Sequence, residues 1–495
     1  MKISKLLALT LTFTIICCCF SACDNNGNMD ETVVMEGSYS LLSASQSGED
    51  VTGNFGIYSV EFSGSDMDVF ITYLGTPERR KSTYRATKTT VYETFNGQKY
   101  TYTVDGDTLK TKYKDIDSVI DVVLKKEEDP DTADKSVDFE SVLFGESIKD
   151  VKKFNYCPAI LTDVNEKGQT VMHIWYCTNK DSGIIMDHIG YRTGVLQENG
   201  KWLFSDEQIV LAPSPDTWDG RHTCDPTVIK GEFKLNGETY NYLMSYLGCT
   251  TEDYQKNETG LAVAKNVGGP WVKVDNLNPI VPWYDDGDEA VEQQKYESWQ
   301  GTSKIYWGTG MPSLISVDGK GEVLLFYSST LRGTGVRRLD LSDLNNPKNV
   351  YVQSVTYNGA VNSQGGACHP GIADFAYDKI AKRLYVTAVT NEKRPPDVTK
   401  TLVSSHSVLM YVDNVDDMNA ACDLILNGGY KWKIVGYVGP EETGWNRNHN
   451  PGLVKTDGGY IPDSKKIGVV VSTGNNDEAN ENIFTYRLFG HLFNV

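Results

Sequence analysis

The stretch Asp225-Pro226-Thr227-Val228 and the apolar stretch Tyr242-Leu243-Met244-Ser245-Tyr246 that follows it decide the expected fold. A proline opens one apolar strand, a turn follows, and a second apolar strand comes shortly afterwards. Proline fits the first residue of a strand because the ladder does not need its missing N–H there. The same arrangement occurs five times in the chain. The five opening segments are Cys157-Pro158-Ala159-Ile160, Asp225-Pro226-Thr227-Val228, Met311-Pro312-Ser313-Leu314, His369-Pro370-Gly371-Ile372 and Asn450-Pro451-Gly452-Leu453.

The spacing of these prolines leaves room for about four strands in each repeat, and four-stranded repeats around an axis are the blades of a β-propeller. We therefore expect an all-β chain, in which a small β-barrel or sandwich domain precedes a C-terminal five-bladed β-propeller. A β-sandwich with coincidental prolines is the alternative. Because the innermost strand of each blade begins at the axis, the residue before each proline should point toward one central site. These residues are Cys157, Asp225, Met311, His369 and Asn450.

The chain divides into segments of different character. Residues 33–124 alternate apolar and polar side chains at period two, and the turn Asp105-Gly106-Asp107 between two such stretches predicts a hairpin. Its opening segment, residues 37–44, weakly resembles the lipocalin-like domains of bacterial lipoproteins, and we interpret the domain as a spacer or accessory module. Residues 125–136 are charged and contain a proline, which is typical of a solvated linker. The propeller is expected over residues 137–495.

The first residues resemble an export signal. A short positively charged start is followed by the apolar stretch Leu6–Phe20, which is too short to be interpreted first as a membrane span. It ends in Ser21-Ala22-Cys23, which resembles the lipobox of bacterial lipoproteins, where the cysteine is acylated. This predicts a signal peptide over residues 1–22 and a tether over residues 23–32. The chain is then expected in the bacterial cell envelope, at the outer membrane or cell surface. The acyl chains on Cys23 would be its only attachment to the membrane.

Composition excludes some partners and leaves the cysteines open. The net charge of -19 argues against nucleic acid, which requires a basic surface. Six cysteines follow Cys23, and none forms the C-x-x-C pattern of a structural zinc site. Two interpretations remain open: small buried thiols, or disulfides that join Cys157 to Cys177 and Cys224 to Cys249.

Several short motifs in the second repeat resemble the first blade of five-bladed propeller glycosidases, the family-43 arabinanases and xylosidases. The motifs are Asp225–Lys230, Tyr242–Tyr246, Gly260–Lys265 and Gly268–Trp271, and Asn448-His449-Asn450 resembles a later family motif. The resemblance implies that Asp225 is the general base of an inverting hydrolysis. It also implies that His449 lies on the axis and helps to hold a metal ion through water. No cofactor is required, and a calcium ion at the axis would be in keeping with the family.

The chain departs from this family at two positions. The family has a second aspartate, which tunes a pKa and orients groups, at the position of Met311. It has the glutamate that acts as the general acid at the position of Cys368-His369-Pro370. Inverting hydrolysis needs an acid as well as a base. The acid is then His369, or a loop carboxylate among Asp285, Asp286, Asp288, Glu289 and Glu297, or the site has lost catalysis and only binds sugar.

Aromatic and basic residues precede the axial positions in several repeats, which suits stacking on sugar rings and hydrogen bonds to hydroxyl groups. The candidate substrate-binding residues are Trp218, Arg221, His222, Trp307, Met311, Trp445, Arg447 and Asn450. Three functions therefore compete: a glycoside hydrolase, a glycan-binding lipoprotein without catalysis, and a structural or partner-binding propeller. The first two predict an oligosaccharide or polysaccharide as partner, and the sequence leaves enzymatic activity undecided.

Overall fold

The computed structural model describes residues 33–35, 37–63, 66–74, 76–115, 118–126, 136–145, 154–179, 186–251, 255–302, 304–368, 370–390, 392, 404–474 and 486–495. Two residues with predicted roles, Cys23 and His369, lie outside these ranges. The chain separates into two compact units, residues 1–134 and 135–495. No helix within the described ranges has the length and apolar character needed to cross a membrane.

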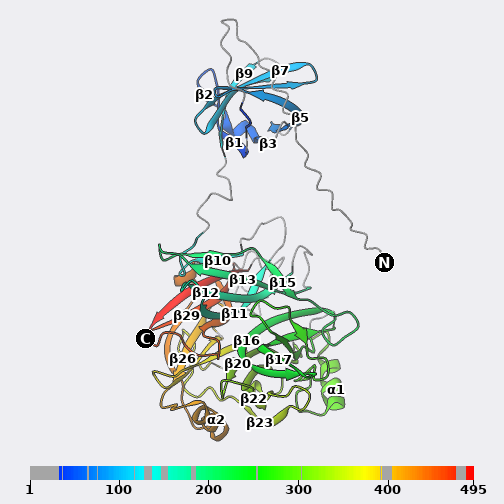
Figure 1. Cartoon of the computed structure of the whole chain (residues 1–495), viewed down its shortest axis with the longest axis vertical. Helices are drawn as coiled ribbons and strands as arrows, with labels where there is room; N and C mark the ends of the chain where they lie inside the picture. Colours follow the sequence, from blue (N-terminus) through cyan, green and yellow to red (C-terminus); the bar gives the residue numbers. More distant parts are fainter. Residues whose placement is uncertain are drawn as a thin grey trace, which may run out of the picture. The chain divides into compact units, whose positions relative to one another are not determined.

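The first unit is a β-barrel, so the barrel alternative holds over the sandwich (Figure 1). Its strands pair antiparallel in nearly sequential order, and pairing between the first strand, β1, and the last, β9, closes the sheet. The elements are β1 (Gly37–Gln46), β2 (Glu49–Asp50), η1 (Thr52–Asn54), β3 (Phe55–Ser63), β4 (Asp66–Tyr73), β5 (Thr76–Ala86), β6 (Thr90–Phe95), β7 (Gln98–Asp105), β8 (Thr108–Asp115) and β9 (Ser118–Lys126).

Alternation decides which side chains fill this barrel. In β4, Met67, Val69, Ile71 and Tyr73 are buried, while the residues between them are more exposed. The interior also holds a buried ion pair, in which Arg80 Nε donates to Glu93 Oε1 at 3.1 Å. A buried charge pair needs further hydrogen bonds to offset its desolvation, and here Glu93 also accepts from a tyrosine hydroxyl and a serine hydroxyl.

The second unit is a five-bladed propeller. Three blades are separate four-stranded sheets, and the other two join through parallel pairing of their inner strands. The first blade contains β11 (Asn155–Val164), β12 (Thr170–Thr178), β13 (His188–Leu196), β14 (Trp202–Phe204) and β15 (Gln208–Leu211), and the second contains β16 (His222–Leu235), β17 (Glu238–Cys249), β18 (Glu258–Ala264) and β19 (Val272–Lys273). The third blade contains β20 (Thr309–Ser316), β21 (Glu322–Ser329), β22 (Gly333–Asp340) and β23 (Lys348–Ser354), and the fourth contains β24 (Ala373–Asp378), β25 (Arg383–Val389), β26 (Ser407–Val412) and β27 (Lys433–Val438). The fifth blade contains β28 (Arg447–Lys455), β29 (Lys466–Gly474), β30 (Arg487–Asn494) and β10 (Val142–Phe144).

Contacts between the inner strands close the ring. Strand β11 contacts β16, β16 contacts β20, β20 contacts β24, β24 contacts β28, and β28 returns to β11. The last blade takes its outermost strand, β10, from the beginning of the unit, where it pairs antiparallel with β30 (Figure 1). Among the described residues of this unit, three α-helices lie between strands: α1 (Glu289–Trp299), α2 (Met418–Asn427) and α3 (Pro440–Thr443).

The sequence predicted that each proline opens an inner strand, and this prediction is wrong for four of the five. Only Pro370 precedes its strand, β24. The other four lie inside β11, β16, β20 and β28, each at a break in the ladder register. A bulge leaves a residue without a ladder bond, so proline is tolerated there as well as at a strand start. The residue before each of these prolines has a positive φ, which is uncommon outside glycine: 51° at Cys157, 46° at Asp225, 47° at Met311 and 46° at Asn450.

A buried ion pair connects three inner strands below these bulges. Asp374 of β24 accepts from Lys455 Nζ of β28 at 2.7 Å and from the Ser313 hydroxyl of β20 at 2.6 Å. Lys455 is only 1% exposed, so its ammonium group is paired with this carboxylate instead of with water. The contact therefore fixes the third, fourth and fifth blades to one another near the axis.

Candidate functional site

The four bulged residues meet as predicted. Cys157, Asp225, Met311 and Asn450 line one cavity of about 40 Å³ on the propeller axis. A water needs about 10–15 Å³ of such volume, and pockets for small molecules usually exceed about 300 Å³. The cavity therefore has room for only a few waters, so a sugar ring would have to lie above it.

Asp225 is nearly sealed at this floor, with 5% of its surface exposed. Its backbone N–H donates to Cys177 Sγ at 2.9 Å, and its Oδ1 lies 3.3 Å from Cys224 Sγ and 3.8 Å from Cys177 Sγ. Burial raises the pKa of Asp225 to about 6, although the Cys157 thiol, which donates to it, and the His222 ring act in the opposite direction. Asp225 is thus an ionised but poorly solvated carboxylate at neutral pH.

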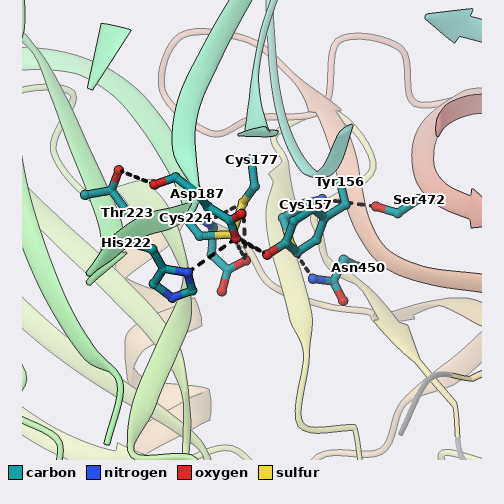
Figure 2. The surroundings of a disulfide bond; sticks show 10 residues. Tyr156, Cys157, Cys177, Asp187, His222, Thr223, Cys224, Asn450 and Ser472 are labelled. Atoms are coloured by element: carbon teal, nitrogen blue, oxygen red, sulfur yellow. Dashed lines mark hydrogen bonds and ion pairs between the residues drawn. A yellow bond between two sulfur atoms is a disulfide. The ribbon is translucent and has the colours of Figure 1, made fainter. Parts of the chain in front are cut away.

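Both disulfides considered from the sequence are wrong. The bond joins Cys177 of β12 to Cys224 of β16, so it connects two blades rather than two strands of one blade (Figure 2). Cys157 remains a buried thiol beside it, as Cys249, Cys368 and Cys422 remain buried thiols elsewhere. Burial and the Asp225 carboxylate raise the pKa of the Cys157 thiol well above its usual range. The Asn450 side-chain amide donates to the same sulfur.

A second carboxylate that the sequence did not single out lies in the same cluster. Asp187, immediately before β13, is fully buried and accepts from the Tyr156 hydroxyl (Figure 2). Its Oδ2 lies 3.4 Å from His222 Nδ1, and the Tyr156 hydroxyl lies 3.2 Å from Cys224 Sγ. Neither Asp187 nor Tyr156 stands in a repeated motif, so only the blade geometry reveals them.

The surroundings of His449 do not fit a calcium ion. Burial and the Arg447 guanidinium lower the pKa of His449 to about 3, so the ring is neutral. The ring packs against Tyr486, with centroids 5.0 Å apart, and Arg447 lies over the same tyrosine. Calcium takes six to eight oxygen ligands, whereas within the part of the chain that the structure describes the groups that act on His449 are the Arg447 guanidinium and the Asn450 side chain. A cation beside Arg447 would also be repelled.

The three predicted tryptophans have different environments. Trp307 packs half-buried against the cysteine cluster at the axis, and its Nε1 donates to the Ser328 hydroxyl at 3.2 Å. Trp218 lies over blade two, where Gly248 and Gly260 leave room for its ring: a Cβ on either glycine would be 2.3 Å from it. Trp445 packs near Phe489 in the last blade. Of these three tryptophans, Trp307 is therefore the one that packs against the axial cysteine cluster.

The loop carboxylates have structural partners. Asp285 is buried and pairs with Arg332 and Arg337, and Asp286 pairs with the same two arginines. Asp288 caps α1, where its side chain accepts from Val291 N. Glu289 stands in the first turn of that helix, and Glu297 accepts from Gln293. These contacts explain the acidic loop without a role in catalysis.

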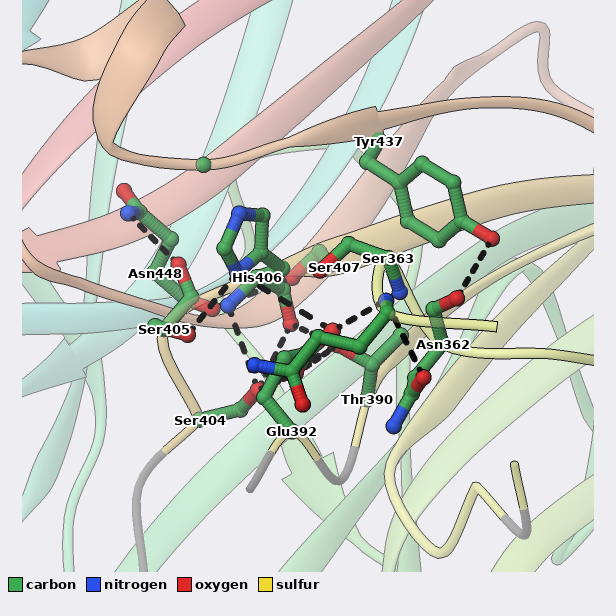
Figure 3. A network of polar contacts seen from close by, with 12 residues as sticks. Asn362, Ser363, Thr390, Glu392, Ser404, Ser405, His406, Ser407, Tyr437 and Asn448 are labelled. Atoms are coloured by element: carbon green, nitrogen blue, oxygen red, sulfur yellow. Dashed lines mark hydrogen bonds and ion pairs between the residues drawn. The ribbon is translucent and has the colours of Figure 1, made fainter. Parts of the chain in front are cut away.

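A separate polar network gathers around Glu392, between β25 and β26 (Figure 3). Its carboxylate accepts from the Thr390 hydroxyl at 2.5 Å and from Ser363 N at 3.1 Å. Burial opposes its ionisation, but these hydrogen bonds outweigh burial and lower the pKa of Glu392. His406 lies 3.9 Å away and bonds to the Ser405 hydroxyl. A carboxylate held ionised in this way is a poor proton donor.

Comparison with known proteins gives fold neighbours at low identity. No family model matches the chain, and no curated protein matches it. Among solved structures, an exo-β-1,3-galactanase from Phanerochaete chrysosporium shares 12% identity with a TM-score of 0.39, covering 68% of this chain and 60% of its own. A family-43 endo-arabinanase from Bacillus licheniformis shares 14%, with a TM-score of 0.38 and coverage of 70% and 96%.

An exo-1,5-α-L-arabinanase from a bovine ruminal metagenomic library shares 14% identity, with a TM-score of 0.38 and coverage of 69% and 94%. The neighbours are thus family-43 arabinanases and galactanases, and this chain spans 60% of the fungal galactanase structure. At these scores the likeness assigns neither family nor activity. The sheet topology of the chain itself defines its class, an all-β protein with a five-bladed propeller.

Proposed function

We propose that the chain is a carbohydrate-active protein that hydrolyses a glycosidic bond at the mouth of the propeller, with Asp225 as the general base. The observation that supports this most is the axial position of Asp225 together with a pKa of about 6. A base with this pKa is ionised at pH 7 and accepts a proton more readily than an ordinary aspartate. Trp307, which packs against the axial cysteine cluster, provides an aromatic surface for a sugar ring.

The acid of an inverting pair must be a second group. Glu392 is held ionised and is therefore a poor proton donor, whereas Asp285 and Asp286 are engaged in ion pairs with Arg337. Two histidines are the candidates: His369, which follows from the sequence alone, and His222, which lies near Asp225 on β16 and beside Asp187. An imidazolium is a competent donor near neutral pH.

A non-catalytic glycan-binding protein is the second candidate, and one observation favours it. The other described positions of the axial ring hold a thiol, a thioether and an amide, and Asp225 Oδ1 faces sulfur atoms. That arrangement leaves Asp225 little space for an attacking water. In either case we propose that acylated Cys23 anchors the chain in the cell envelope, so that the propeller meets oligosaccharides or polysaccharides outside the cell.

One experiment separates the two candidates. The full chain is screened with arabinan, β-1,3-galactan and host oligosaccharides, and both released reducing ends and the shift in thermal unfolding are measured. Asp225→Asn should lower release by about 10²–10⁴-fold and leave the thermal shift. Asp457→Asn, an exposed aspartate beyond the far end of β28, is the matched control and should behave as wild type. A thermal shift without release in wild type would establish the binding protein, and release retained in Asp225→Asn would exclude the proposed base.

A further inference from the structure

The sulfur atoms at the axis form a group whose chemistry the proposed hydrolysis does not use. Cys157 comes from β11, Cys177 from β12 and Cys224 from β16, and all three are buried. Their sulfurs and one oxygen of Asp225 all lie within 4.8 Å of one another. Two of the sulfurs form the disulfide, and the third is a thiol in contact with the same carboxylate.

We propose that Cys157, Cys177, Cys224 and Asp225 form a tetrahedral binding site for a thiophilic divalent metal ion, such as Zn²⁺, when the disulfide is reduced. Three thiolates and one carboxylate are a donor set that suits zinc. The inference is independent of whether Asp225 acts as a base. The site has no C-x-x-C motif that would predict it from the sequence, because its ligands come from three strands of two neighbouring blades.

Distances agree with this coordination. Bonds of about 2.3 Å to sulfur and 2.1 Å to oxygen, at tetrahedral angles, place a sulfur and an oxygen ligand about 3.6 Å apart. The observed distances from Asp225 Oδ1 are 3.3 Å to Cys224 Sγ and 3.8 Å to Cys177 Sγ. Opening the disulfide lets its two sulfurs separate to about 3.8 Å, the spacing of two thiolates on one zinc ion.

Groups outside the ligand set support the same assignment. The Asn450 amide donates to Cys157 Sγ, and the backbone N–H of Asp225 donates to Cys177 Sγ at 2.9 Å (Figure 2 shows Asn450, Cys157 and Cys177). Donors of this kind orient thiolate ligands and spread their negative charge. The axial cavity of about 40 Å³ borders Cys157 and Asp225 and provides the space for entry.

Binding of a metal ion at this site first requires reduction of the disulfide. A trialkylphosphine breaks the Cys177–Cys224 bond, takes the oxygen of one water to become a phosphine oxide, and leaves two thiols that carry the hydrogens of that water. Binding of the metal ion then releases three thiol protons, while Asp225 binds as the carboxylate. A metal ion at this site would occupy Asp225, so the loaded protein could not use that carboxylate as a base.

The test uses Co²⁺ as the probe on the full chain under anaerobic conditions. Phosphine-reduced wild type should bind one Co²⁺ with a thiolate-to-cobalt charge-transfer absorption that Zn²⁺ abolishes, whereas the oxidised chain should show no such band. Cys157→Ser should weaken binding at least about tenfold. Cys249→Ser removes a buried thiol outside the cluster and should bind as wild type. Near-UV circular dichroism confirms that each reduced sample is folded.

Absence of the band in the reduced, folded wild type would overturn the proposal, as would its loss in Cys249→Ser with retention in Cys157→Ser. If reduction unfolds the chain, the reduced chain is refolded with Zn²⁺ and weighed by native mass spectrometry. A refolded chain without zinc overturns the proposal equally. Hydrolysis is assayed separately on the oxidised, metal-free chain, so failure of the proposed function leaves this result unaffected.

Discussion

Replacing Asp225 by Asn should remove a pH dependence of stability whose size follows from burial. The pKa of Asp225 rises from 3.8 to about 6 on folding. Between these values the folded state binds a proton that the unfolded state does not. The stabilisation is therefore fully present below about pH 4 and is lost as pH rises through about 6. At 1.36 kcal/mol per pKa unit, the loss is about 3 kcal/mol.

Urea unfolding of wild type and Asp225→Asn at pH 4, 5, 6 and 7 measures this difference. Other groups, including His449, titrate in both proteins and cancel in the comparison. Because the unfolded aspartate is already partly ionised at pH 4, the stability of wild type relative to the variant should fall by about 2.5 kcal/mol from pH 4 to pH 7. Asp457→Asn should follow wild type at every pH. The assignment of a buried carboxylate with a raised pKa would be refuted if the unfolding free energies of wild type and Asp225→Asn changed equally with pH. It would also be refuted if wild type gained stability relative to the variant as the pH rose.

Three further substitutions test the packing. Asp374→Asn leaves Lys455 buried without its counter-charge and should lower the free energy of urea unfolding by about 3–5 kcal/mol. Adding Lys455→Met should restore most of this stability. An equal loss of stability in the double variant would contradict the ion-pair explanation. Glu93→Gln removes the buried carboxylate of Arg80 in the barrel and leaves it only the more exposed Glu78 as an ion-pair partner, and calorimetry should show a lower barrel transition with the propeller transition unchanged. Gly248→Ala places a methyl group 2.3 Å from the Trp218 ring and should cost about 1–3 kcal/mol with altered tryptophan fluorescence, whereas Gly371→Ala, with open space around it, should change neither.

Repetition made the propeller predictable. Five proline-led segments followed by apolar strands indicated five blades, and the residues before four of the prolines do line one axial cavity. The expected position of proline was wrong because a bulge satisfies the same requirement as a strand start. In the barrel, alternation predicted which side chains are buried, but the choice between barrel and sandwich depends on pairing of β1 with β9, which no local pattern shows.

The site was less predictable because its contacts cross between blades. Cys177 and Cys224 are distant in sequence and belong to different sheets, so local strand pairing suggested the wrong partners. Asp187 reaches the cluster from a connection between strands and has no motif around it. His369 and Cys23, which carry two of the sequence-based roles, lie outside the described residues and stay predictions.

The way the last blade is completed has a consequence for how the propeller assembles. Strand β10 is made before every other strand of the unit, yet its partner β30 is made last. Until β30 is available, β10 lacks its strand partner, and until β28 is made the first inner strand, β11, cannot pair with it, so the growing chain exposes open sheet edges. Such a distant pairing makes ring closure a late and slow step of folding. Loss of the final residues would therefore leave the last blade without its outer half, because β10 would have no strand to pair with.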